Sequence, residues 1–223
     1  MASTTERKAR FVIGFGVFFA ALWLAWSTPI VYPLKIFVVL LHELSHAMAV
    51  VATGGTLHSI TLDPRQGGAT YFTGGSAFVA LNAGYLGSLA WGALLFTASR
   101  TRWVRSDWVT GLIGALVIIL TIFFIRTPFG IAFGIVFGLA MVAVSREMGR
   151  VMNRRLLWVL GLTSALYAIL DIKSDVLDRP ELQSDAAVLA DMLGLPTLLV
   201  GVAWIGIALA FSAWLLARAY RDA

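Results

Sequence analysis

Seven long apolar stretches limit what this chain can fold into. Charged residues make up only 13% of its 223 residues, about half the usual share in globular proteins, and they gather between the stretches. A membrane helix needs about 20 mostly apolar residues. The sequence therefore predicts an all-α polytopic membrane protein, a single domain over residues 1–223 in the cell membrane. The stretches cover residues 11–26, 30–53, 77–98, 108–125, 129–145, 156–172 and 196–217.

The number of transmembrane helices is predicted as six or seven. The fourth and fifth stretches are joined only by residues 126–128, and Pro29 and Pro33 favour a bend where the second begins. Residues 1–10 form a polar, basic tail ahead of the first stretch, an order that signal peptides share. No small-x-small cleavage site follows, and the bulky run 22–26 indicates a retained helix with interfacial tryptophans.

Basic residues cluster beside the apolar stretches, at 7–10, 100–105, 146–155 and 218–221. The net charge of +5 therefore indicates contact with anionic lipid headgroups rather than with nucleic acid. Three apolar stretches separate the first cluster from the second, so the positive-inside rule gives no consistent orientation. A re-entrant second stretch, or an N-terminus placed against the rule, would each resolve this conflict.

The second stretch contains the motif His42-Glu43-Leu44-Ser45-His46, the His-Glu-x-x-His signature of zinc metallopeptidases. On a helix, residues four apart share a face, so His42 and His46 can bind one ion while Glu43 lies beside it. An uncompensated acid at the centre of a membrane helix costs about 2.5 to 3.5 kcal/mol, and a bound cation offers compensation. The chain has no cysteine, so the ligands must be nitrogen and oxygen atoms.

Residues 54–76, between the second and third stretches, read as a short β-hairpin. Two runs rich in β-branched and aromatic residues flank the turn sequence Asp-Pro-Arg-Gln-Gly-Gly at 63–68. The alternative is an ordinary loop outside the membrane. A hairpin beside a metal would offer a sheet edge that can hold an extended peptide by strand addition.

A catalytic zinc usually takes a third protein ligand, and several residues compete for that role. His58 is best interpreted as a solvated histidine on the hairpin, while Glu147 and Glu181 have basic neighbours and look like solvated charges. Asp171 and Asp175 lie four apart, on one face of a helix that ends the sixth stretch. We expect Asp171, the deeper of the two, to be the ligand, with Asp175 as an alternative.

Two further polar residues are candidates near the site. Asp185 lies in the polar connection at residues 173–195, where Ser184 is expected to cap a helix and Asp185 to favour its positive end. Capping explains Asp185 without a metal, and we keep it as an alternative ligand or as a residue that supports the ligands. Asn82, an amide within the third stretch, is a candidate contact for substrate or for the oxyanion.

The motif on a membrane helix, the glycine-flanked hairpin and the sequence Gly84-Tyr85-Leu86-Gly87-Ser88 together resemble the site-2 protease family of intramembrane zinc metallopeptidases. The resemblance is closest to its short, single-domain peptidase-like branch. It implies a hairpin next to the metal and a third ligand from an aspartate on a later helix, which adds weight to Asp171 or Asp175. The usual Leu-Asp-Gly of the family is absent, and Leu170-Asp171-Ile172 stands in its place.

These features predict a zinc endopeptidase that cuts a peptide bond in or near the bilayer. Glu43 would accept a proton from water activated by Zn²⁺ and pass it to the leaving amine. The expected partners are the lipid bilayer and a membrane-protein or peptide substrate. The alternative is a non-proteolytic protein that binds or carries metal in the membrane, as a pseudoprotease would.

Overall fold

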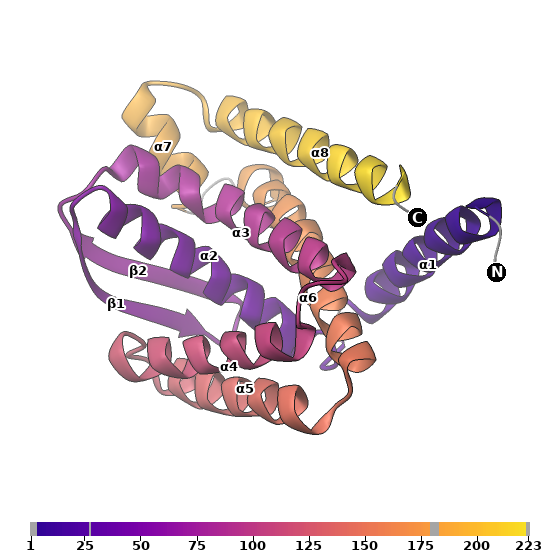
Figure 1. Cartoon of the computed structure of the whole chain (residues 1–223). Coiled ribbons are helices and arrows are strands. Elements are labelled where there is room, and N and C mark those ends of the chain that lie inside the picture. The colour runs from indigo at the N-terminus through magenta and orange to yellow at the C-terminus, as the bar shows by residue number, and fades with distance from the viewer. Residues whose placement is uncertain (1–3, 27, 179–182, 222–223) are drawn as a thin grey trace.

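The computed structural model describes residues 4–26, 28–178 and 183–221. Within these residues, seven helices are long and apolar enough to cross a membrane, one for each of the seven predicted apolar stretches (Figure 1). The elements in chain order are α1 (Thr4–Ala25), α2 (Tyr32–Ala52), β1 (Thr56–Asp63), β2 (Gly67–Thr73), α3 (Ala77–Arg100), α4 (Ser106–Phe123), α5 (Pro128–Glu147), α6 (Arg150–Lys173), η1 (Ser174–Asp178), α7 (Asp185–Leu193) and α8 (Thr197–Arg221).

Two segments predicted as polar connections contain helix. Helix α1 begins at Thr4 and so takes in most of the predicted N-terminal tail, because Glu, Arg, Lys and Ala are good helix formers. The connection at 173–195 holds the π-helical turn η1 and the nine-residue helix α7. Ser184 caps α7 as expected, accepting a hydrogen bond from the backbone N–H of Ala187, and Gly194 ends it at a φ of 66°.

The predicted hairpin between α2 and α3 is confirmed. Strands β1 and β2 pair antiparallel, and the turn closes through a hydrogen bond from the Gln66 N–H to the Asp63 carbonyl at 3.0 Å. The outer edge of β1 is partly covered by residues 124–126, since the Ile60 N–H donates to the Phe124 carbonyl at 2.9 Å. The sheet has two strands in the described residues, so the outer edge of β2 is the open one.

Helix α2 is the centre of the molecule and lies between the hairpin and α3 in Figure 1. Its residues 36–41 form the main core with Ile60 and Leu62 of β1 and with Leu157 and Leu160 of α6. The non-helical backbone of the hairpin is therefore packed against protein, which is the condition for such backbone at membrane depth.

The basic clusters meet at one end of the molecule. The Arg100 guanidinium, at the end of α3, lies 5.0 Å from the centre of the Phe11 ring of α1 and donates to the Ala219 carbonyl of α8 at 2.8 Å. Arg154 of the third cluster donates to the carbonyl of Arg102 in the second at 3.4 Å. Figure 1 accordingly shows the start of α1 and the end of α8 on the same side of the molecule.

Because α1 begins where α3 ends, the helices α1, α2 and α3 cannot all cross the full membrane. Helix α2 is the most enclosed of the seven, with 72% of its apolar window buried. Lys35, in its first turn, is only 6% exposed and lies over the Trp26 ring at 4.4 Å. These features favour a re-entrant second segment, and this arrangement puts all four basic clusters on one side, as the positive-inside rule requires.

Candidate metal centre

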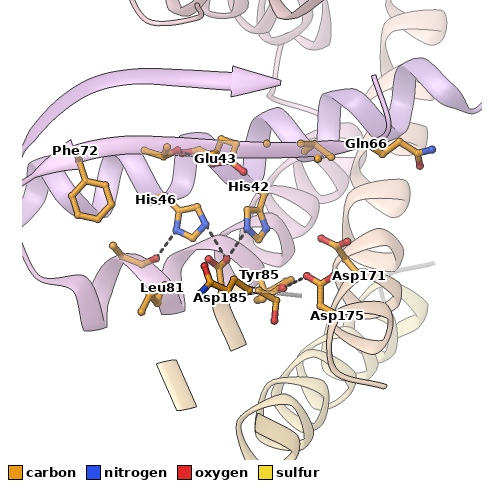
Figure 2. Close-up of a pocket in the computed structure, with 18 of the residues that line it drawn as sticks. His42, Glu43, His46, Gln66, Phe72, Leu81, Tyr85, Asp171, Asp175 and Asp185 are labelled. Carbon is orange, nitrogen blue, oxygen red and sulfur yellow. Dashed lines mark hydrogen bonds and ion pairs between the residues drawn. The ribbon is translucent and has the colours of Figure 1, made fainter. Parts of the chain in front are cut away.

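Helix α2 turns His42 and His46 toward the same point, as their spacing predicts. The Nε2 atom of His42 lies 2.9 Å from Oδ2 of Asp185, and the Nε2 atom of His46 lies 3.0 Å from the same oxygen. Among the described residues, these three form a group whose ligand atoms all lie within 4.8 Å of one another. Figure 2 shows the two rings converging on Asp185.

The donor set fits a zinc ion. Zinc binds imidazole nitrogen and carboxylate oxygen at about 2.0–2.2 Å, so two ligand atoms of a tetrahedral site lie about 3.3 Å apart. The nitrogen-to-oxygen distances of 2.9 and 3.0 Å are within a few tenths of that separation. Two imidazoles and one carboxylate also leave one position of a tetrahedral ion for water, as catalytic zinc sites do.

A backbone carbonyl orients His46. Its Nδ1 donates to the Ala80 carbonyl of α3 at 2.8 Å, which turns Nε2 toward Asp185. Metal-binding histidines in proteins use the same arrangement, because the second nitrogen fixes the tautomer and the ring orientation. Ala80 is itself buried, in the first turn of α3, where Ser76 caps the helix.

Gly84 of α3 leaves the space that the two rings occupy. A Cβ atom at this position would lie 2.6 Å from Nε2 of both His42 and His46. We expect Gly84→Ala to displace these flexible side chains and to weaken zinc binding at least about tenfold, measured by competition with a chelator. Gly206→Ala is the matched control, since a Cβ there meets nothing within 4 Å. Unchanged zinc affinity in Gly84→Ala would contradict the placement of the ion.

Asp185 reaches the histidines from the first turn of α7. Burial raises the pKa of its carboxyl group, but hydrogen bonds from His42 and His46 outweigh burial and hold that pKa well below its usual range. The carboxylate is therefore kept in the charged form that a cation binds. Its side chain is 21% exposed, so the centre is enclosed without being sealed.

The group of close ligand atoms contains a different aspartate from Asp171, the third ligand expected from the sequence. Asp171 and Asp175 both line the cavity that contains the histidines, but the close ligand group includes Asp185 and neither of these two. Asp175 accepts a hydrogen bond from the Tyr85 hydroxyl instead. The reason is tertiary: α7 packs on α3 and α8, and its first residue lies over α2.

Asn82, His58 and Glu147 are not part of the group of close ligand atoms. Asn82 accepts a hydrogen bond from the Trp204 indole at 2.9 Å and donates to the Phe78 carbonyl at 2.8 Å. It joins α3 to α8 and is not among the residues that line the cavity. His58 is exposed on β1 and pairs with Thr73 at 3.0 Å, as interpreted from the sequence. Glu147 ends α5, and Glu181 lies outside the described residues.

The cavity has a volume of about 470 Å³ and is lined by residues of α2, the hairpin, α3, α6 and α7. Glu43, only 4% exposed overall, lines it beside the histidines. Sequence reasoning gave no role to Tyr85, whose ring packs at 4.9 Å against His42 and at 5.0 Å against Trp204. The signal in the sequence that could have identified Tyr85 was its position directly after Gly84 and one helical turn after Leu81. Figure 2 shows Tyr85 between Asp185 and Asp175.

The fold and this centre define a multi-pass membrane protein with a group of residues that could bind a metal. The family model of the Peptidase M50B-like family matches residues 15–215 of the chain. The protein therefore belongs to this family of metallopeptidases, and the resemblance to site-2 proteases is confirmed. No curated protein and no solved structure matches the chain significantly.

Proposed function

We propose that the protein is an intramembrane zinc metalloendopeptidase that hydrolyses peptide bonds of membrane-associated proteins in the cell membrane. His42, His46 and Asp185 would hold the ion, and Glu43 would act as general base and acid. The observation that carries the proposal is the convergence of these four side chains on one cavity in a chain of a metallopeptidase family.

In this proposal a side chain of the protein, Glu43, accepts and donates the protons. When bound, zinc would lower the pKa of water toward about 7 and polarise the scissile carbonyl. Glu43 faces the cavity from the turn that carries His42, so it is placed to take a proton from water and deliver it to the leaving amine nitrogen. Its near-complete burial removes competing solvent around the carboxylate.

The hairpin supplies a place for an extended substrate. Residues 67–70 of β2 line the cavity, and the outer edge of this strand is open in the described residues. A peptide that adds to that edge would hydrogen-bond through its main chain and pass beside Glu43. Such pairing requires an extended segment, so a substrate helix would have to unwind near the cleavage point.

The test combines metal analysis with turnover of the purified protein in lipid vesicles. The probes are fluorescently labelled casein and a panel of synthetic single-span peptides. We expect one zinc ion per chain, cleavage of at least one probe, loss of cleavage after chelation and recovery on adding zinc. Bound zinc without turnover would favour the carrier or pseudoprotease, and a metal-free protein that is indifferent to chelators would overturn the proposal.

A further inference from the structure

The side chain of Glu43 is held by the hairpin. The Thr70 hydroxyl, on β2, lies 2.8 Å from Oε2 of Glu43 and 3.0 Å from the Glu43 backbone carbonyl. A hydroxyl carries one proton, so it donates to one of these oxygens at a time and both lie within its reach. A single side chain of the strand thus touches the glutamate at its main chain and at its carboxylate.

Gly68 limits the carboxylate from a second direction. It lies two residues before Thr70 on β2, and residues two apart in a strand share a face. A Cβ atom at Gly68 would lie 2.6 Å from Oε1 and 2.7 Å from Cγ of Glu43. The strand therefore presents a hydrogen-bond donor to one carboxylate oxygen, and the missing side chain of Gly68 leaves the space beside the other oxygen.

We infer that β2 positions the general base, with Thr70 as the positioning residue. The inference rests on the proposed function. Glutamate has several rotatable bonds, and holding it in one geometry before reaction avoids an entropy loss during it. The donor at Oε2 leaves Oε1, next to Gly68, as the oxygen available to exchange a proton. The strand with the open edge for substrate is then also the strand that sets the base.

A purely structural role for Thr70 makes a different prediction. If the hydroxyl only tied the hairpin to α2 through the Glu43 carbonyl, its loss would loosen the cavity wall, and substrate binding and zinc retention would decline together. If it positions the carboxylate, its loss would slow the chemical step while KM and zinc content stay unchanged.

The experiment compares Thr70→Val, Thr70→Ser and Gly68→Ala with the wild type in the vesicle assay. We expect Thr70→Val and Gly68→Ala to lower kcat by about 10- to 100-fold with KM and zinc content within about twofold of wild type, and Thr70→Ser to restore most of kcat. Thr61→Val is the matched control, because the Thr61 hydroxyl bonds only within the hairpin, to the Ala69 carbonyl at 3.4 Å.

Three results would overturn the inference. They are wild-type kcat in Thr70→Val, an equal loss of kcat in Thr70→Ser, or a rise in KM together with a fall in zinc content. If Thr70→Val proves too unstable to purify, Gly68→Ala decides alone, since it adds one methyl group and removes no hydrogen bond. A wild-type protein that holds zinc and cleaves no probe would remove the proposed function as well, whereas an active wild type with active variants removes only the role of β2.

Discussion

Replacing Glu43 by glutamine is expected to lower peptide cleavage by about 10²- to 10⁴-fold, the range that general acid–base catalysis contributes. Glutamine has nearly the same shape, and its amide oxygen can still accept the hydrogen bond from Thr70. It cannot take up a proton from water at neutral pH. Glu43 is not part of the ligand group, so zinc should remain bound at one ion per chain. Initial cleavage rates and metal content on the same preparation check both statements.

Glu147→Gln provides the matched control for this substitution. Glu147 lies at the exposed end of α5, outside the cavity, so the same chemical change there should leave cleavage unaltered. An amide is less costly to bury than a charged carboxylate, and Glu43→Gln is therefore not expected to unfold the protein. Cleavage at wild-type rate by Glu43→Gln would refute its role as base, and loss of zinc would show that Glu43 is a ligand.

The fold was largely predictable because its main signals are local. Seven apolar stretches became seven helices, and the turn sequence at 63–68 formed the turn of a hairpin. What the sequence did not disclose is where helices lie relative to one another. The orientation conflict arose because membrane crossings were counted along the chain. The contact of Arg100 with Phe11, which brings the end of α3 to the start of α1, depends on tertiary packing alone and leaves no local signal.

The candidate site was predictable where its residues are close in sequence. His42, Glu43 and His46 share one helix, so their geometry follows from the helical repeat. Asp185 comes from 139 residues beyond His46, and its position depends on the packing of α7 against Tyr85 and Trp204. No local sequence pattern predicts that packing, and helix capping alone was enough to explain an aspartate at position 185. The partner of the Asn82 amide was not predictable for the same reason, because Trp204 lies on α8.

Replacing Asp185 by asparagine is expected to weaken zinc binding by more than about 100-fold. Loss of a supporting residue outside the ligand set costs about 10- to 100-fold in metal affinity, and loss of one of three ligands should exceed that. Asparagine keeps the size of the side chain and lies one residue after the Ser184 cap, so α7 should stay in place. Zinc affinity measured by chelator competition, with cleavage rates on the same samples, tests this expectation.

Asp171→Asn and Asp175→Asn decide between the three aspartates. Both residues line the cavity, so each substitution removes one negative charge near the ion, as Asp185→Asn does. If Asp185 is the ligand, these two variants should retain one zinc per chain, with affinity reduced only by the weaker electrostatic attraction. Loss of zinc in Asp171→Asn together with retention in Asp185→Asn would restore the choice made from the sequence. That result would mean that α6, rather than α7, closes the metal centre.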